Sequence, residues 1–127
     1  MAELYRRQVN RPLSPAERAL LRWLIEHGEP EARNYAEQLD RVHVSSECTC
    51  GCPSINFQLE GSARLGDDDW LIISNVVGNS PEGIKVNLIL HAHAGALYEL
   101  EIYSVDGQTP FSLPRSEDLK DWEDAFA

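Results

Sequence analysis

Three cysteines within five residues are the side chains of this sequence whose type and spacing suggest chemistry. Cys48, Cys50 and Cys52 alternate with Thr49 and Gly51, and they are all the cysteines that the 127 residues contain. Three thiolates and one imidazole would complete a tetrahedral zinc site. Thiols so close together also perform redox chemistry, and free cysteines otherwise fill crowded strand faces as small apolar side chains. On the sequence alone these three interpretations stay open.

Two histidines separated by one residue form the second candidate group. On a regular strand His91 and His93 share one face, which is a common arrangement in metal sites. We expect His43, His91 or His93 to supply the fourth ligand of a zinc ion held by the cysteines. The alternation of the next strand places Glu99 and Glu101 on the same face. This face is either a metal or acid–base site, or simply the solvated side of a hairpin.

The acidic charge of the chain bears on its partners. The net charge is −10, and all of this excess lies in residues 42–127, because acids and bases balance in residues 1–41. Such a surface repels nucleic acid and anionic lipid and favours a basic protein partner, although acidity also serves solubility. The carboxylates expected to bind that partner are Glu99, Glu101, Glu117, Asp118, Asp121, Glu123 and Asp124.

The remaining composition indicates a small cytoplasmic domain without enzymatic activity. An odd number of cysteines argues against a disulfide framework, and no apolar run approaches the roughly 18 residues of a membrane span. The polar N-terminus has no signal-peptide pattern. We found no motif for a known reaction. The sequence therefore predicts a single domain over residues 1–127, present as a monomer or weak homodimer.

The first third of the chain is predicted to be helical, over residues 12–40. Ser14 and Glu17 have the spacing of a capping box around Pro15, and apolar residues then recur at helical spacing. Gly28 is the expected left-handed terminator of this helix. A second helix is expected after Pro30.

Residues 42–105 alternate with period two and predict an antiparallel sheet of about five strands. The nearly continuous apolar run 70–77 predicts a strand covered on both faces. Residues 85–93 and 97–105 are expected to form a hairpin in which one face of each arm is apolar. These faces have even-numbered residues, Val86, Leu88, Leu90 and Ala92 in the first arm and Tyr98, Leu100 and Ile102 in the second, so partner numbers must add up to an even number. This excludes a two-residue turn and predicts a loop of three or five residues.

Residues 106–127 are expected to form an extended tail and a short helix starting at Ser116. Trp23, Trp70 and Trp122 lie in different thirds of the chain and are expected to anchor the core. The predicted fold is therefore α+β, with two N-terminal helices on a mostly antiparallel sheet of about five strands and a short C-terminal helix.

Two stretches resemble known proteins. The segment Cys48-Thr49-Cys50-Gly51-Cys52-Pro53-Ser54, which follows Leu-Ser-Pro-Ala-Glu-Arg at residues 13–18, resembles small bacterial proteins without an assigned activity. The residues 97–107 and 111–114 are similar to the last hairpin and tail of acidic immunity proteins of bacterial polymorphic or contact-dependent toxin systems. This resemblance implies a non-enzymatic binding protein that neutralises a basic toxin, and it implies no catalytic residues. The alternative is a zinc-binding or thiol-dependent protein that uses the three cysteines.

Overall fold

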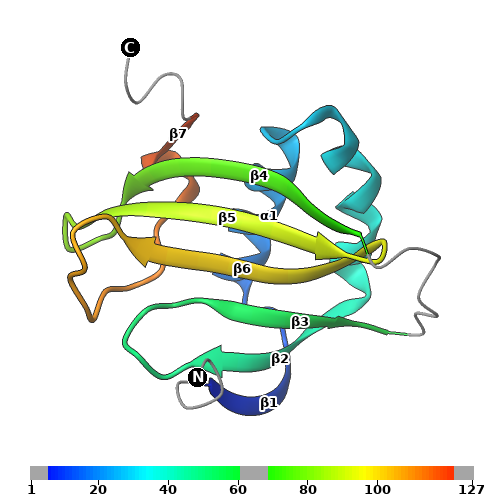
Figure 1. The fold of residues 1–127 in the computed structure, drawn as a ribbon, viewed down its shortest axis with the longest axis horizontal. Coiled ribbons are helices and arrows are strands. Elements are labelled where there is room, and N and C mark those ends of the chain that lie inside the picture. Colours follow the sequence, from blue (N-terminus) through cyan, green and yellow to red (C-terminus); the bar gives the residue numbers. More distant parts are fainter. Residues whose placement is uncertain (1–5, 61–68, 122–127) are drawn as a thin grey trace.

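One antiparallel sheet with a single layer of helices forms the molecule (Figure 1). The computed structural model describes residues 6–60 and 69–121. Its elements are β1 (Arg6–Pro12), α1 (Pro15–Glu26), the 3₁₀ helix η2 (Pro30–Asp40), β2 (Val42–Cys48), β3 (Ile55–Leu59), β4 (Trp70–Asn79), β5 (Lys85–His93), β6 (Ala96–Ser104), the 3₁₀ turn η3 (Ser116–Asp118) and β7 (Leu119–Asp121). The strand order is β1-β2-β3-β6-β5-β4-β7.

The predicted arrangement of two helices on about five strands with a closing helix is wrong. The sheet has seven strands, because both ends of the described chain add an edge strand. Arg6–Pro12 is mostly polar, with three arginines and one proline, yet it pairs with β2 through a bulge between Gln8 and Arg11. Ser116–Asp118 is a single 3₁₀ turn, and the chain then pairs with β4 as β7. Edge strands need only one partner, so their sequences carry a weak apolar pattern.

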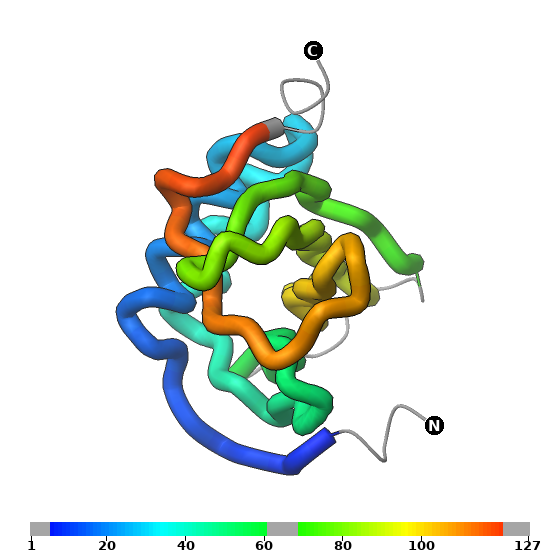
Figure 2. Tube along the Cα trace, turned by 90° about the vertical axis from the view of Figure 1, so that its left-hand side faces the viewer, coloured from blue at the N-terminus to red at the C-terminus, as the bar shows by residue number. Residues whose placement is uncertain are grey.

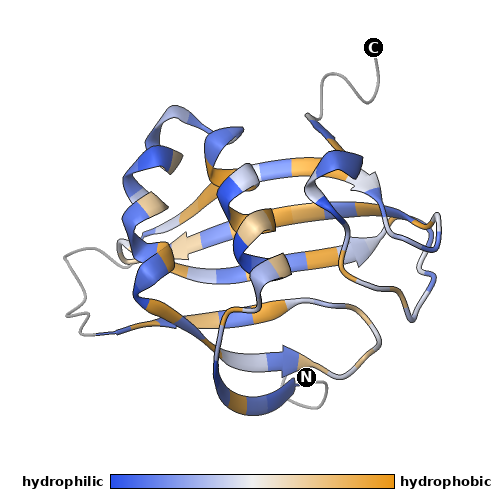
Figure 3. Cartoon of the chain, turned by 180° about the vertical axis from the view of Figure 1, so that it is seen from behind, coloured by the Kyte–Doolittle hydropathy of each residue, from blue (hydrophilic) through white to orange (hydrophobic). Residues whose placement is uncertain are grey.

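Helix α1 covers one side of the sheet, which we call the inner face; the opposite side is the outer face (Figures 1 and 3). The predicted capping box is confirmed, because Ser14 Oγ accepts from the Glu17 amide and Glu17 accepts from the Ser14 amide. The leucines of α1, Leu20, Leu21 and Leu24, are at most 1% exposed and pack on the inner-face residues of the strands. Burial of these side chains supplies about 1.5–3 kcal/mol each.

Gly28 does not end α1 in the left-handed conformation that the sequence suggested. The cap residue is His27, and Gly28 has no positive φ. Its role is steric, because a Cβ at this position would lie 2.5 Å from the carbonyl oxygen of Ile73. The next amide, Glu29 N, donates to the same oxygen at 2.9 Å, so the helix end is held directly against β4.

The β5–β6 hairpin follows the predicted register but not the predicted turn. Leu88 pairs with Ile102 and Leu90 with Leu100, so partner numbers do add up to an even number. The turn nevertheless has two residues, Ala94 and Gly95, both with positive φ as a type I′ turn requires. A bulge makes the even-sum register compatible with a two-residue turn. Ala92 pairs with Leu97 whereas His91 pairs with Glu99, so one extra residue is left in β6.

The extra residue of this bulge is Tyr98, and it changes which side chains face solvent. Leu97 becomes buried in place of Tyr98, which lies on the outer face and is exposed. The expected burial of β4 on both faces is also wrong at its start, because Trp70, Leu71 and Ile72 are exposed. Trp70 is therefore not a core anchor. Trp23 is partly buried against the core, and Trp122 lies outside the described residues.

Candidate functional site

The three cysteines lie on the hairpin loop between β2 and β3, not along a regular strand. Cys48 ends β2, and its amide donates to the carbonyl of Ser54 at 3.1 Å, which closes the loop. Gly51 lies midway with φ 108°, a backbone conformation that favours glycine. The turn at Gly51 folds the chain back on itself, so that residues two apart point to a common centre. We call residues Cys48–Ser54 the thiol loop.

The three sulfur atoms of the thiol loop converge. Sγ of Cys48 lies 2.9 Å from Sγ of Cys50, which lies 3.1 Å from Sγ of Cys52. All three atoms lie within 4.8 Å of one another, and each cysteine is a free thiol. Cys50 is exposed, whereas Cys48 and Cys52 are partly buried. This arrangement can hold a metal ion.

The thiols differ in acidity because of their hydrogen bonds. Burial, together with the donation of its proton to Cys50, raises the pKa of Cys48 to about 12. Burial also acts to raise the pKa of Cys50, but its hydrogen bonds with Cys48 and Cys52 outweigh this effect and hold the pKa of Cys50 below its usual value. Negative charge is therefore stabilised at the sulfur of Cys50, which is also the exposed cysteine.

A serine connects the thiol loop to the sheet. Cys52 Sγ donates to Ser54 Oγ at 3.4 Å, and Ser54 Oγ donates to the carbonyl of Ile102 at 3.0 Å. The same hydroxyl accepts from the Ile102 amide at 2.8 Å. Ser54 is buried, so this hydroxyl takes the place of a backbone ladder bond between the start of β3 and the end of β6.

The segment that follows β6 supports the thiol loop from the other side. Figure 2 shows this segment running along the end of the sheet. The Phe111 amide donates to the Gly51 carbonyl at 3.1 Å, and a Cβ at Gly51 would lie 3.2 Å from Cα of Pro110. Glu82 in turn accepts hydrogen bonds from the amide and hydroxyl of Ser112, and these lower its pKa to about 2.

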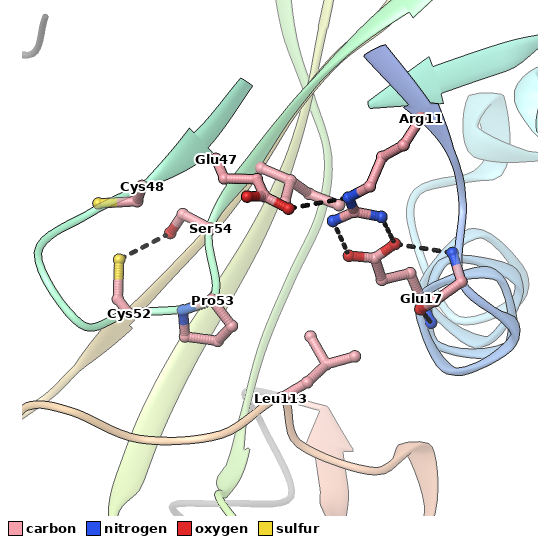
Figure 4. Close-up of a pocket in the computed structure, with 10 residues that line it drawn as sticks. Arg11, Glu17, Glu47, Cys48, Cys52, Pro53, Ser54 and Leu113 are labelled. Atoms are coloured by element: carbon pink, nitrogen blue, oxygen red, sulfur yellow. Dashed lines mark hydrogen bonds and ion pairs between the residues drawn. The ribbon is translucent and has the colours of Figure 1, made fainter. Parts of the chain in front are cut away.

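A network of ion pairs lies next to the thiol loop (Figure 4). Arg11 donates to both carboxylate oxygens of Glu17, at 2.8 and 2.9 Å, and its Nε donates to Glu47 at 2.8 Å. Hydrogen bonds from Arg7 and then Arg11 hold the pKa of Glu47 below its usual value. A surface cavity of about 420 Å³ separates these groups from the sulfurs. Its lining includes Arg11, Glu17, Glu47, Cys48, Cys52 and Leu113.

The structure does not bring the predicted histidine ligands to the cysteines. Within residues 6–60 and 69–121, the thiol group contains no histidine. His91 and His93 belong to β5, which is separated from β2 by β3 and β6. His91 Nε2 lies 2.9 Å from Glu101, as the shared face predicted, and His93 stacks on Trp70. His43 lies at the opposite end of β2 from Cys48.

The carboxylates predicted to bind a basic partner are mostly paired within the chain. Glu99 accepts from Arg6 at 2.8 Å, and Glu101 contacts His91. Asp118 pairs with Arg115 at 3.1 Å, and Glu117 lies 4.0 Å from the same guanidinium. Asp121 belongs to β7, and Glu123 and Asp124 lie outside the described residues.

Sequence reasoning missed the groups that surround the thiols. Ser54 carried no signal, because its partner Ile102 is 48 residues away. Glu17 was recognised only as a helix cap, and Arg11 was not recognised because its position depends on the bulge in β1. The sequence around Glu17 has no lysine or arginine one helical turn away, so it did not indicate which cation neutralises this carboxylate.

Comparison with known proteins gives a family. Residues 10–114 match a family described as a domain of unknown function, DUF6984. The chain belongs to this family. The match includes the thiol loop and its support at Phe111, as well as the pair of Arg11 and Glu17. No curated protein and no solved structure matches the chain.

The DUF6984 description assigns no activity, so function rests on the geometry of the chain itself. As regards membranes, none of the helices in the described part is both long and apolar enough to cross a bilayer. The thiol loop is the group of side chains with the clearest chemical capacity. It combines three soft ligand atoms, one exposed sulfur and a firm attachment to the sheet.

Proposed function

We propose that this DUF6984 protein binds a soft metal ion, zinc in the first instance, through the thiolates of Cys48, Cys50 and Cys52. The convergence of the three sulfurs within 4.8 Å carries this proposal. On a regular strand, side chains two residues apart share a face but lie about 6.6 Å apart. Here the positive φ of Gly51 turns the chain and brings the sulfurs closer together. Thiolates are the ligands that zinc and other soft ions prefer.

The spacing of the sulfurs supports a compact site. Zinc–sulfur bonds of about 2.3 Å in tetrahedral geometry place ligand sulfurs roughly 3.8 Å apart. The separations of 2.9 and 3.1 Å in the structure need to increase by less than about 1 Å, which rotations about χ1 achieve. The loop therefore requires little rearrangement to accept an ion.

The exposure of Cys50 supports an open site. Three protein ligands leave a fourth position of a tetrahedral ion for water or for a ligand from another molecule. Structural zinc sites are usually closed by four protein ligands, whereas sites that exchange or react keep a position open. An exposed central thiol makes that position accessible from solvent. The proposed function is thus reversible metal binding or transfer.

Neutralisation of a basic toxin stays a prediction with less support. On the Glu99–Glu101 face, Glu99 pairs with Arg6 and Glu101 contacts His91, and these contacts within the chain reduce the attraction of the carboxylates for a basic partner. The acidic net charge favours such a partner only in a general way.

Metal content and cobalt substitution test the proposal. We would purify the untagged chain with reduced thiols, measure metal by mass spectrometry, and titrate the metal-free protein with Co²⁺. One metal per chain and a thiolate-to-cobalt charge-transfer band are expected. Replacement of any one cysteine by serine should lower the affinity for zinc by more than about 100-fold. This exceeds the effect of replacing a residue that only hydrogen-bonds to a metal ligand.

A conservative change in the same loop provides the control. Thr49→Ser alters an exposed residue between two cysteines and should leave zinc affinity unchanged. Affinity should rise with pH, because ligation releases thiol protons. A chain that binds no metal, gives no cobalt band and has three freely titratable thiols would refute the proposal.

A further inference from the structure

The outer face of the sheet carries most of the exposed apolar side chains. Of the six large apolar side chains exposed in the described part of the chain, only Leu71 points away from this face by strand register. The other five are Trp70, Ile72, Tyr98, Tyr103 and Val105. The helices lie on the inner face, so this apolar surface is not used to hold α1 or η2 (Figures 1 and 3). Exposed apolar patches with polar residues around them are typical of interaction sites.

One corner of the outer face is an ordered aromatic cluster. Trp70 stacks on His93 with ring centroids 4.0 Å apart and meets Tyr98 edge to face at 4.9 Å. Trp70 remains 60% exposed in spite of these contacts. Aromatic rings already fixed by their neighbours lose little conformational freedom on association, and tryptophan and tyrosine are the commonest anchors of interfaces. The bulge at Tyr98 creates this corner.

The charges of the outer face are balanced, unlike those of the chain as a whole. Arg6 is paired with Glu99 at 2.8 Å, and Glu101 lies 2.9 Å from His91. By strand register Lys85 and Lys120 belong to the same face. Among residues 6–60 and 69–121, this face therefore has no excess of carboxylates, although the net charge of the chain is −10. It offers little attraction to a basic protein and little repulsion to a copy of itself.

The size of this face is also appropriate for self-association. β5 and β6 have nine residues each, which corresponds to a length of about 30 Å. Five strands, β2 to β4 in sheet order, extend about 20 Å across. The footprint of roughly 600 Å² is of the order of the 800 Å² that each partner of a specific complex buries.

We propose that the outer face binds a second copy of the chain, so that two sheets pack face to face about a two-fold axis. The Trp70–Tyr98 corner lies at one end of the β5–β6 hairpin, and Tyr103 and Val105 lie at the other. A two-fold axis that crosses the strands places each aromatic corner on the opposite end of the second copy. The apolar ends are then covered, and the paired charges lie between them. This inference does not depend on metal binding.

Sedimentation of the full chain, with thiols kept reduced, tests the proposal. We expect the fraction of dimer to rise as the chain concentration is increased to about 200 µM, as for a weak complex with a small interface. Trp70→Ser should weaken the dimer at least about tenfold, because it removes an aromatic anchor that is already held in place by His93 and Tyr98. Val105→Glu, at the far end of the face, should do the same if both ends are buried together.

Leu71→Ser is the matched control, because Leu71 is the next residue of the same strand, is 41% exposed and points away from the outer face. It should change the dissociation constant less than about twofold. Added salt should strengthen or leave unchanged an apolar dimer of two acidic chains. A monomer at every concentration, a dimer insensitive to Trp70→Ser and Val105→Glu, or a dimer dissociated by salt would overturn the proposal.

Discussion

Arg11 and Glu17 form a two-point ion pair that joins β1 to the first turn of α1. Both guanidinium Nη atoms of Arg11 donate to the Glu17 carboxylate, at 2.8 and 2.9 Å. The same carboxylate accepts the Ser14 amide, so one side chain closes the capping box and fixes an edge strand. Glu17 is buried, and a buried carboxylate without these partners would be strongly destabilising.

We predict that Glu17→Gln lowers the free energy of unfolding by about 2 kcal/mol, somewhat below the cost of breaking a fully buried pair because Arg11 is one-third exposed. Urea denaturation at neutral pH measures the change. Arg18→Ala is the control, since Arg18 pairs with the exposed Asp40 and should lose less than about 1 kcal/mol. Equal effects of the two substitutions would contradict this account.

The same pair predicts a pH dependence of stability. Burial acts to raise the pKa of Glu17, but the hydrogen bonds from Arg11 and Ser14 outweigh it, so the pKa is below the usual 4.5. Its contribution is therefore complete above pH 4.5 and is lost as the pH falls through the lower folded value. In the Glu17→Gln variant, the free energy of unfolding should therefore decrease less steeply as the pH falls through this range. An unchanged acid profile would show that other carboxylates dominate.

Cys50 should be the first thiol to react with an alkylating agent in the metal-free chain. It is exposed, and its hydrogen bonds with both neighbouring cysteines lower its pKa, whereas the Cys48 thiol has a pKa of about 12. Mass spectrometry after brief treatment with iodoacetamide at neutral pH identifies the modified residue. Cys48→Ala removes one donor and should slow the reaction of Cys50. Equal rates at all three thiols would exclude this ordering.

Gly51→Ala should weaken metal binding without unfolding the domain. The substitution adds strain at φ 108° and a Cβ close to Pro110, so the thiol loop has to move. Gly83→Ala is a matched control, because Gly83 also has a positive φ of 84° but has open space around it and lies outside the thiol loop. It should reduce stability by about 1 kcal/mol and leave zinc affinity unchanged. Similar zinc affinities of the two variants would argue against a preformed loop.

The double substitution His91→Ala and His93→Ala should leave the metal affinity unchanged. These residues lie on β5, and the described thiol group contains no histidine. Isothermal titration of both proteins with zinc gives the comparison. A large loss of affinity would restore the four-ligand site that the sequence suggested.

Local patterns of the sequence predicted those features that depend on neighbouring residues. The capping box of α1 needs only Ser14 and Glu17, and it was predicted correctly. The register of β5 and β6 follows from the alternation of apolar residues, and it was also correct. The turn was predicted wrongly because the extra residue Tyr98 shifts the register by one, and alternation alone does not reveal a bulge.

Features that depend on distant segments could not be predicted in this way. β1 and β7 are edge strands whose pairing partners, β2 and β4, determine their conformation. The sulfur cluster was expected as a shared strand face, whereas the structure forms it from a loop turned at Gly51. The presence of a candidate thiol site was therefore predictable, but its geometry and its lack of a histidine ligand were not.

The hydroxyl of Ser54 links the state of the sulfurs to the main chain of β6. As a thiol, Cys52 donates to this hydroxyl; as a metal-bound thiolate it can only accept. Ligation should therefore draw the Ser54 proton away from the Ile102 carbonyl, at the place where β3 and β6 share only two residue pairs. The amide of Ile102 donates to the same hydroxyl, so its rate of exchange with deuterium should differ between the metal-free and the metal-bound chain.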